Sequence, residues 1–210
     1  MNIVLLGAPG AGKGTLAEAL EKKLSIPSIS TGNVIRKALK SGTEIGNKAK
    51  DIVEAGRLLP DDMVVGIMKN ELKGDKFKSG FVLDGFPRTV PQAEALDKMQ
   101  FVIDKVINID VNDEVIAKRM SGRVVCEDCG STYHLVNKPP TKKGVCDLCS
   151  GKLSRRKDDE PDTVKNRLLI YHEETEPLID YYKKQGKLAF VDGGGGIEHL
   201  VESALSALGC

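Results

Sequence analysis

The residues from Gly7 to Thr15 have the types and spacing of a phosphate-binding loop. They read GAPGAGKGT and fit the pattern G-x-x-x-x-G-K between an apolar run and a helical pattern. The glycines let backbone N–H groups converge on phosphate oxygens, and Lys13 supplies a positive charge for the β- and γ-phosphates. A plain strand–helix turn is the alternative, but motif and context agree on phosphate. The residues expected to contact phosphate are Gly10, Ala11, Gly12, Lys13, Gly14 and Thr15.

One position departs from the usual motif. Gly14 stands where such loops commonly carry the Ser or Thr that holds Mg²⁺, and the hydroxyl is displaced to Thr15. This argues against a GTPase or a motor-type ATPase, because both rely on that hydroxyl. Mg²⁺ could be held by the phosphates, by water or by Thr15, and the sequence does not choose among them.

Four cysteines form a second constellation. The pairs Cys126/Cys129 and Cys146/Cys149 have the pattern C-x₂-C…C-x₂-C, with sixteen residues between the pairs. This spacing is typical of a tetrahedral Zn²⁺ site that stabilises structure and takes no part in catalysis. Four free thiols, disulfides, or Fe²⁺ or Co²⁺ on the same ligands are the alternatives. The fifth cysteine, Cys210, is expected to be free.

The elements that must position these groups alternate along the chain. Apolar runs predict five strands: 2–6, 27–30, 81–84, 102–109 and 188–191. Helical patterns separate them at 16–24, 31–72, 91–99, 113–120 and 161–184, and a last helix follows the glycines at 193–196. This alternation predicts an α/β fold, a parallel five-stranded sheet wrapped by helices. The cysteine segment from Gly122 to about Arg156 lacks such periodicity and is expected to form a small inserted lobe.

Composition narrows the class of protein. The 210 residues include 31 basic and 30 acidic side chains, for a net charge of +1, and 40% are hydrophobic. The balance argues against binding to nucleic acid or an anionic membrane. The chain lacks a membrane-length apolar run and a signal-peptide pattern at its start. We therefore expect a cytoplasmic protein, and its length favours a monomer.

Four motifs occur in an order that is similar to the adenylate kinase family, in its long bacterial form with a metal-bearing lid. They are Gly7 to Thr15, Ser30-Thr31-Gly32, Asp84 to Arg88 and Arg156 to Asp159, and the resemblance covers essentially the whole chain. It implies reversible phosphoryl transfer from Mg·ATP to AMP, giving two ADP. It also implies a P-loop core (1–29, 60–121 and 160–210), a helical AMP-binding lobe (30–59) and a zinc-binding lid (122–159).

The resemblance assigns residues to the two nucleotides. On the ATP side it adds Arg119, Arg123, Thr132, Tyr133 and Gly195 to the phosphate loop. On the AMP side it implies Thr31, Gly32, Arg36, Arg57, Leu58, Leu59, Gly85, Phe86, Pro87, Arg88, Gln92, Arg156 and Arg167, with Gln92 at the adenine edge. For Arg36 and Arg57 the alternative is an ordinary solvated helix charge. Asn33 stands where many members carry Asp.

Transfer of a phosphoryl group requires mainly positioning and cations that converge from different segments. The candidates are Lys13, Arg88, Arg123, Arg156 and Arg167. Asp84 follows a predicted strand, at the sheet edge where ligands bind, and is expected to act through Mg²⁺-bound water. Asp158 and Asp159 are expected to orient the arginines, or to be simple N-terminal helix charges. The three histidines are scattered, so direct transfer without a covalent intermediate is expected.

The sequence is also compatible with two alternative functions. One is a kinase for another monophosphate, such as UMP or GMP, because base choice depends on one or two hydrogen bonds. The other is a zinc-ribbon ATP-binding protein that regulates or binds nucleic acid. Tyr133 is the only aromatic residue in the cysteine segment, which is too few for a stacking platform.

Overall fold

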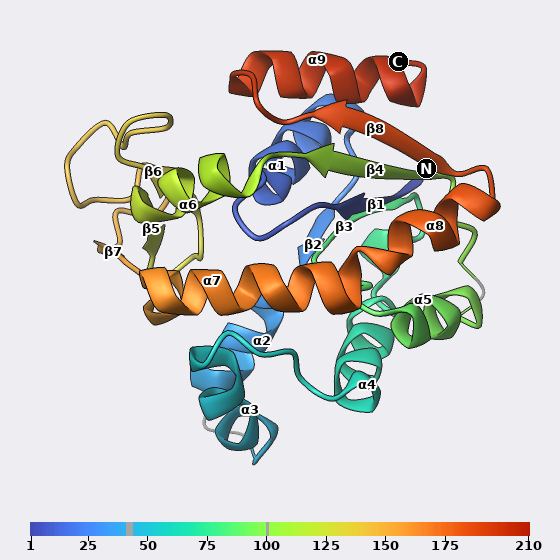
Figure 1. Ribbon diagram of the computed structural model, residues 1–210, viewed down its shortest axis with the longest axis horizontal. Helices are drawn as coiled ribbons and strands as arrows, with labels where there is room; N and C mark the ends of the chain where they lie inside the picture. Colours follow the sequence, from blue (N-terminus) through green and yellow to red (C-terminus); the bar gives the residue numbers. More distant parts are fainter. Residues whose placement is uncertain (41–43, 100) are drawn as a thin grey trace.

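The computed structural model describes residues 1–40, 44–99 and 101–210 and contains a five-stranded parallel sheet (Figure 1). The strand order is β2-β3-β1-β4-β8. The strands are β1 (Asn2–Leu6), β2 (Ser28–Ser30), β3 (Phe81–Asp84), β4 (Lys105–Asp110) and β8 (Leu188–Asp192). The predicted α/β fold is confirmed, although β4 begins three residues later than the apolar run suggested.

Helices cover both faces of this sheet, which explains why the central strand β1 has buried apolar residues on both of its faces. Alternate residues of β1 face opposite sides: Ile3 and Leu5 pack with one cluster, Val4 and Leu6 with another. Helices α1 (Lys13–Leu24) and α9 (Ile197–Leu208) cover the first side, and α4 (Asp61–Glu71), α5 (Val90–Asp97) and α8 (Pro177–Lys184) the second. Helix α6 (Asp113–Ser121) packs on α7 (Pro161–Ile170) through a smaller cluster.

The helical pattern predicted over 31–72 is divided. It forms α2 (Thr31–Lys40), α3 (Glu44–Glu54) and α4, with the short 3-10 turn η1 (Asp75–Phe77) after them. Gly56, at φ +71°, turns the chain out of α3, and Pro60 keeps the residue before it extended. Helices α2 and α3 extend below the sheet as a separate lobe (Figure 1).

The long helix predicted over 161–184 is also interrupted. Between α7 and α8 lies a π-helical turn, η3 (Tyr171–Thr175), in which the Glu176 N–H donates to the Tyr171 carbonyl at 2.8 Å. Pro177 has no N–H to continue the regular ladder, and its ring would crowd the preceding turn. The wider turn places the Thr175 hydroxyl where it donates to the Arg88 carbonyl at 2.7 Å.

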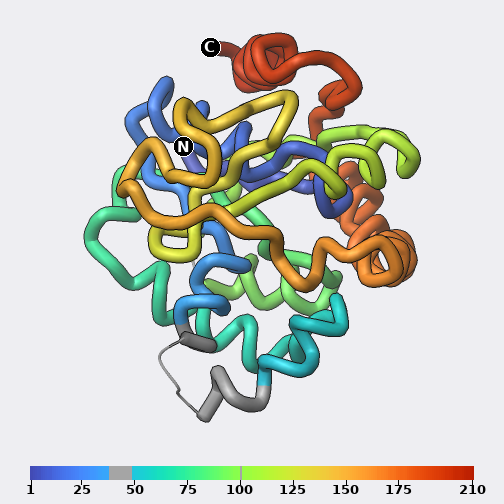
Figure 2. The backbone as a smooth tube through the Cα atoms, turned by 90° about the vertical axis from the view of Figure 1, so that its left-hand side faces the viewer, coloured from blue at the N-terminus to red at the C-terminus, as the bar shows by residue number. Residues whose placement is uncertain are grey.

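The cysteine segment folds into a three-stranded antiparallel sheet. Its strands are β5 (Arg123–Cys126), β6 (Thr132–His134) and β7 (Leu153–Ser154), in the order β6-β5-β7, followed by the 3-10 turn η2 (Lys157–Asp159). We call residues 122–159 the lid and residues 30–59 the helical lobe. Figure 2 shows the lid, in yellow and orange, above the helical lobe, whose α2 is blue. Among the described residues, no helix is long and apolar enough to cross a membrane.

Candidate active site

Two adjoining cavities open at the carboxyl edge of the sheet, where β1, β2 and β3 end. The larger has a volume of about 1120 Å³ and is lined by the phosphate loop, the lid and the glycine turn before α9. The smaller, of about 60 Å³, lies against the helical lobe. Both cavities are lined by Arg36, Arg88 and Arg167, so these three cations stand at the junction.

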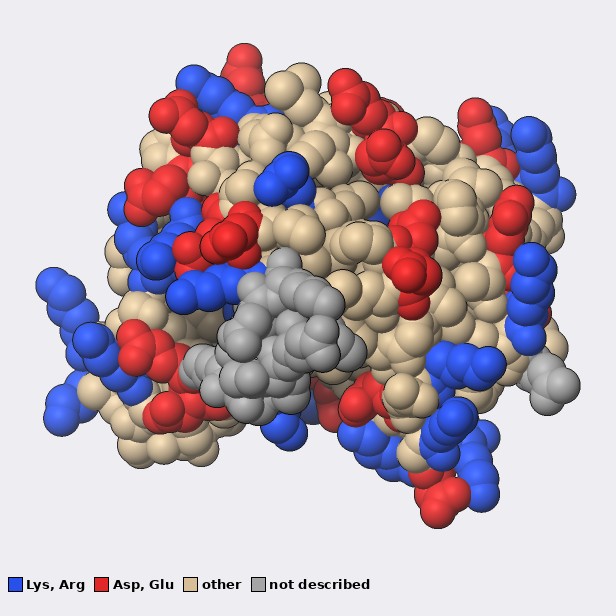
Figure 3. All heavy atoms as spheres, turned by 90° about the horizontal axis from the view of Figure 1, so that it is seen from below, with Lys and Arg blue, Asp and Glu red and all other residues tan. Residues whose placement is uncertain are grey.

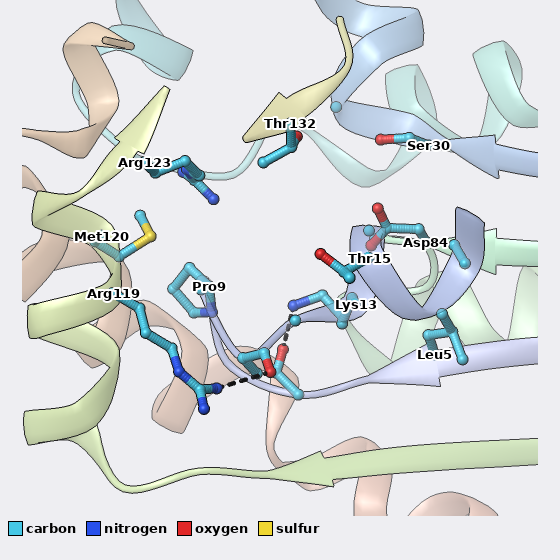
Figure 4. A pocket seen from close by; sticks show the side chains of 18 of the residues that line it. Leu5, Pro9, Lys13, Thr15, Ser30, Asp84, Arg119, Met120, Arg123 and Thr132 are labelled. Atoms are coloured by element: carbon cyan, nitrogen blue, oxygen red, sulfur yellow. Dashed lines mark hydrogen bonds between the residues drawn. The ribbon is translucent and has the colours of Figure 1, made fainter. Parts of the chain in front are cut away.

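The phosphate loop has the backbone that its glycines predict. Gly7, Gly10 and Gly12 all have positive φ, and a Cβ on Gly7 would lie 2.8 Å from the Ile109 carbonyl oxygen. A larger residue at Gly7 would therefore push the loop off β4. The Lys13 ammonium donates to the carbonyls of Gly7 at 2.6 Å and Ala8 at 2.9 Å, and so spans the loop (Figure 4).

Burial lowers the pKa of Lys13 to about 8. The negative charge of Asp84 opposes this shift, while the nearby positive charges of Arg88, Arg167 and Arg123 reinforce it. A cation held among other cations is stabilised by an anionic ligand, which is the property expected of a phosphate site.

Asp84 at the end of β3 and Thr15 in the first turn of α1 both line the larger cavity, and Ser30 lies on the neighbouring strand β2 (Figure 4). The β2–β3 pairing sets Ser30 beside Asp84, and a Cβ on Gly14 would lie 3.5 Å from the Asp84 carboxylate. The absence of a side chain at Gly14 thus leaves room in front of that carboxylate. A carboxylate and a hydroxyl at this spot are hard oxygen ligands of the kind that Mg²⁺ prefers.

The arginines predicted at the site converge on the larger cavity. Arg123 donates to Asp159 through Nε at 2.7 Å and through a second, parallel contact. Arg167 donates to Asp158 at 2.8 Å and to Asp159 at 3.2 Å. Asp159 is only 5% exposed, and its carboxylate holds Arg123 of the lid and Arg167 of α7 close to each other.

Arg156 differs from its neighbours because its Nε is buried without a hydrogen-bond partner among the described residues. Burial lowers its pKa to about 9, and the charges of Arg36 and Arg123 act in the same direction. Burial likewise lowers the pKa of Arg167 to about 10. Arg156 and Arg167 both keep their charge at neutral pH and both line the larger cavity, so each contributes a cation to it.

Basic residues outnumber acidic ones in the lining of the larger cavity. Lysine, arginine and acidic side chains are interspersed on the face seen from below (Figure 3), in keeping with the near-zero net charge. The larger cavity, by contrast, is lined by seven of the basic residues discussed above: Lys13, Arg36, Arg88, Arg119, Arg123, Arg156 and Arg167. Such a cavity fits a small polyanion better than an extended one.

All residues predicted on the ATP side line the larger cavity. Arg119 also joins two of its walls, since it donates to the Ala11 carbonyl at 3.3 Å and to the Gly193 carbonyl at 2.6 Å. The Tyr133 side chain also contacts the cysteine cluster. Its hydroxyl accepts the Asp147 N–H at 2.8 Å and lies 3.5 Å from Cys146 Sγ, so the polar end of the side chain belongs to the cysteine cluster.

Most residues predicted on the AMP side line the smaller cavity: Thr31, Gly32, Arg36, Arg57, Leu58, Leu59, Gly85, Arg88, Gln92 and Arg167. Pro87 and Arg156 line the larger cavity, and Phe86 is fully buried in the core. The sequence did not single out the apolar walls Ile35, Val53 and Val64. Their helical spacing was the available signal, but it marks a buried face without saying what that face contacts.

The four cysteines meet in the lid, with all Sγ atoms within 4.8 Å of one another. Cys126 and Cys149 are 3.4 Å apart at Sγ, and Cys129 and Cys146 are 3.6 Å apart. A tetrahedral ion with ~2.3 Å bonds to sulfur requires sulfur separations of about 3.8 Å. The distances fit such an ion and exclude disulfides, whose sulfurs lie at about 2 Å.

Comparison with known proteins agrees with this geometry. Residues 5–187 match the sequence profile of the family described as adenylate kinase. The chain is 52% identical to the adenylate kinase of Caldicellulosiruptor bescii over 100% of this chain and 99% of the relative. It is 48% identical to that of Ruminiclostridium cellulolyticum, over 100% of both chains, and 48% identical to that of Methanosarcina barkeri, over 99% and 98%.

The chain belongs to the adenylate kinase family.

In this adenylate kinase family member the lid contacts the remainder of the protein at several points. Lys138 in the lid pairs with Glu18 on α1 at 2.6 Å, and both residues line the larger cavity. Lys157 at the base of the lid pairs with Glu54 of the helical lobe at 3.3 Å. A Cβ on Gly130 would lie 3.2 Å from the Asn33 side chain, so lid and helical lobe also touch. The lid thus closes over the larger cavity.

Proposed function

We propose that this adenylate kinase family member transfers the terminal phosphoryl group of Mg·ATP to AMP, giving two ADP in a reversible reaction. The observation that carries the proposal is the pair of adjoining cavities with Arg36, Arg88 and Arg167 at their junction. One cavity contains a phosphate loop, and the other is small and has both aliphatic and polar side chains in its walls. Two nucleotides placed in them would meet phosphate to phosphate among these cations.

The donor triphosphate would lie on the phosphate loop, with its base toward the lid and the glycine turn. Loop N–H groups and Lys13 would hold the β- and γ-phosphates, and Arg119 keeps the loop and the Gly193 carbonyl together. Mg²⁺, when bound with ATP, would neutralise phosphate charge, and Asp84 and Thr15 are the residues placed to hold it, directly or through water.

The acceptor would lie in the smaller cavity, its base between Ile35, Val53 and Val64 and its polar edge toward Gln92. Its phosphate would then point to the junction, where Arg36 and Arg88 can form charge-assisted hydrogen bonds with it. Arg88 is already oriented, since its Nε donates to the Gly85 carbonyl at 3.0 Å.

The transfer itself needs no protein nucleophile. An oxygen of the AMP phosphate attacks the γ-phosphorus. The bond between the γ-phosphorus and the bridging β-phosphate oxygen breaks, and ADP leaves with the electron pair of that bond. Lys13, Arg88, Arg123, Arg156 and Arg167 surround the path and stabilise the charge on the equatorial oxygens. Lid closure brings Arg123 and Arg156 to the site and excludes the water that would otherwise hydrolyse ATP.

The cysteine cluster has a structural role in this proposal. A Zn²⁺ ion on Cys126, Cys129, Cys146 and Cys149 would have no open position for substrate, as in closed four-cysteine sites generally. It would stabilise a lid whose buried cluster has only five residues: Val124, Cys126, Tyr133, Cys146 and Leu153.

Purified protein supplied with Mg·ATP and AMP tests the proposal by the formation of ADP. We expect two ADP for each ATP consumed, no phospho-enzyme on rapid quenching, and negligible ATP hydrolysis without AMP. Parallel reactions with UMP and GMP test the nearest rivals, and both should be poor acceptors. ATP hydrolysis that AMP does not stimulate would contradict the proposal.

A further inference from the structure

The side-chain amide of Gln92 makes a hydrogen bond at both its oxygen and its nitrogen, and these bonds affect which base it can recognise. Its Oε1 accepts the backbone N–H of Arg88 at 2.9 Å. Its Nε2 donates to the Asp61 carboxylate at 2.7 Å. Gln92 is only 1% exposed and lines the smaller cavity, so its amide orientation decides which polar groups the cavity offers.

Asp61 stands behind Gln92 and lines neither cavity. It is the first residue of α4, where the helix N-terminus stabilises a carboxylate. The same oxygen that accepts from Gln92 also accepts the Thr89 hydroxyl at 3.0 Å. The Thr89 hydroxyl in turn accepts the Gln92 backbone N–H at 3.3 Å and caps α5. Asp61 therefore fixes both the side chain and the helix start that carry Gln92.

The two partners of the amide agree on one orientation. An ionised carboxylate only accepts hydrogen bonds, so it requires the NH₂ end of Gln92. A backbone N–H only donates, so it requires the oxygen end. A flipped amide would set its oxygen against a carboxylate and its NH₂ against an N–H. After both bonds are made, one N–H and one oxygen lone pair remain for a ligand, in a fixed order.

That order distinguishes two kinds of purine of nearly equal size. A 6-amino purine offers a donor at its exocyclic nitrogen beside an acceptor at N1. A 6-oxo purine offers an acceptor at its exocyclic oxygen beside a donor at N1, which is the reverse. An amide free to flip could match either edge, whereas a fixed amide matches one and leaves the other with opposed like groups.

We propose that Asp61 is a positioning residue that fixes the donor–acceptor order of Gln92 and so makes the acceptor site select 6-amino over 6-oxo purine monophosphates. This inference rests on the proposed function, because it assumes that the acceptor base lies in the smaller cavity. Asp61 acts through Gln92 and touches no substrate.

The test compares kcat/KM for AMP and for inosine monophosphate, a 6-oxo purine nucleotide. Asp61→Asn can offer either a donor or an acceptor to Gln92, and Asp61→Ala offers neither. Both variants should raise the ratio of inosine monophosphate to AMP by about tenfold, the factor expected from loss of a hydrogen bond to a charged group. KM for ATP should not change. Asp62→Asn is the matched control, because it removes an exposed acid one residue along the same helix and should keep the wild-type ratio.

A double-mutant cycle separates this role from a general structural one. In a Gln92→Leu background the two Asp61 variants should no longer alter the ratio, since no amide remains to be oriented. The proposal is overturned if both variants, folded by circular dichroism, keep the wild-type ratio. It is also overturned if they shift the ratio equally without Gln92. Failure of the wild-type protein to use AMP at all would instead refute the proposed function on which the inference rests.

Discussion

The lid and the helical lobe cover the same cavities but are stabilised in different ways. The apolar residues of the helical lobe, including Ala49, Ile52 and Val53, belong to or pack against the large cluster beneath the sheet. The lid has a separate cluster of five buried residues, two of which are cysteines. A lobe that shares the main core needs no cross-link, whereas a lobe this small needs one.

The contrast extends to the charges at the site. The lid contributes Arg123 and Arg156 together with Asp158 and Asp159. Asp159 accepts from Arg123, and Asp158 pairs with Arg167 of α7, so closure of one small lobe would bring these charges to the site together. The helical lobe contributes Arg36, whose partner is the neutral Asn33 at 2.7 Å. The lid side therefore has ion-paired charges and a four-cysteine cluster that could hold a metal ion, whereas the apolar residues of the helical side pack into the main core.

The largest effect should come from a residue that belongs to neither lobe. Replacing Lys13 with Met removes the charge that spans the phosphate loop, and kcat should fall by about 10³-fold, as for loss of one preorganised donor. Folding and both lobes should be intact by circular dichroism. Lys22→Met, exposed on the same helix, is the control and should leave kcat unchanged. An equal loss of kcat in the two variants would show that Lys13 has no special role at the site.

Breaking the cysteine cluster should affect the lid and spare the helical lobe. Cys146→Ser should lower the bound metal, measured by elemental analysis, and should lower the melting temperature by on the order of 10 °C, because metal binding and lid folding are coupled. KM for ATP should rise more than KM for AMP. Cys210→Ser, outside the cluster, should change none of these. A Cys146→Ser protein with unchanged metal content and melting temperature would contradict the assignment.

Replacing a single cation of the helical lobe should raise KM for AMP more than KM for ATP. Arg36→Gln should raise KM for AMP by roughly 10- to 100-fold, the range expected for one charge-assisted hydrogen bond to phosphate, with KM for ATP nearly unchanged. Lys37→Gln is the exposed neighbour and the control. If KM for ATP rose as much as KM for AMP, the two cavities would not hold separate nucleotides.

The pH dependence of kcat/KM for ATP should report on Lys13, which belongs to the core and to neither lobe. Because the Lys13 pKa is lowered to about 8 by burial, the free enzyme loses this ammonium as pH rises through 8. We expect kcat/KM for ATP to fall by about tenfold per pH unit above that value, and to be independent of this group below it. Lys13→Arg should be slower but should lack this limb, because a guanidinium stays charged.

The smallest effect should come from the contact between the lid and α1. Lys138 and Glu18 are partly exposed, with side chains 34% and 40% accessible, so their ion pair should be worth less than 1 kcal/mol. Lys138→Met should raise KM for ATP by about fivefold at most, and the effect should shrink as salt increases. A double-mutant cycle with Glu18→Gln measures the coupling energy between the two side chains. Zero coupling at low salt would show that this ion pair does not contribute to lid closure.

Much of this architecture follows from local patterns in the sequence. The glycines of the phosphate loop, the apolar strands and the cysteine spacing each act over a few residues, so their structures were predictable. The interruption of the long helix at η3 was visible in principle as Pro177, but the helical pattern on both sides concealed it. Just before β4, the Asp104 side chain accepts the Asn2 N–H at 2.6 Å, a contact between distant segments that the apolar run does not reveal.

The contacts that could not be predicted join distant segments. Lys138 and Glu18 are 120 residues apart, and Asp61 and Gln92 are 31 apart. In the sequence Lys138, Glu18 and Asp61 are ordinary surface-type charges, and only the tertiary structure gives each of them its partner. The contact of the Tyr133 hydroxyl with the cysteine cluster likewise depends on how the two cysteine pairs close on each other, which no local pattern predicts.

A crystal structure with a bisubstrate dinucleotide, two adenosines joined by a polyphosphate, tests the two-cavity arrangement most directly. The predicted result is one adenosine beneath the lid, the other against Gln92 in the smaller cavity, and the phosphates between Lys13 and Arg88. Anomalous scattering at the zinc edge should show an ion among the four cysteines. A second adenosine outside the smaller cavity, or phosphates that avoid the arginine junction, would contradict this arrangement.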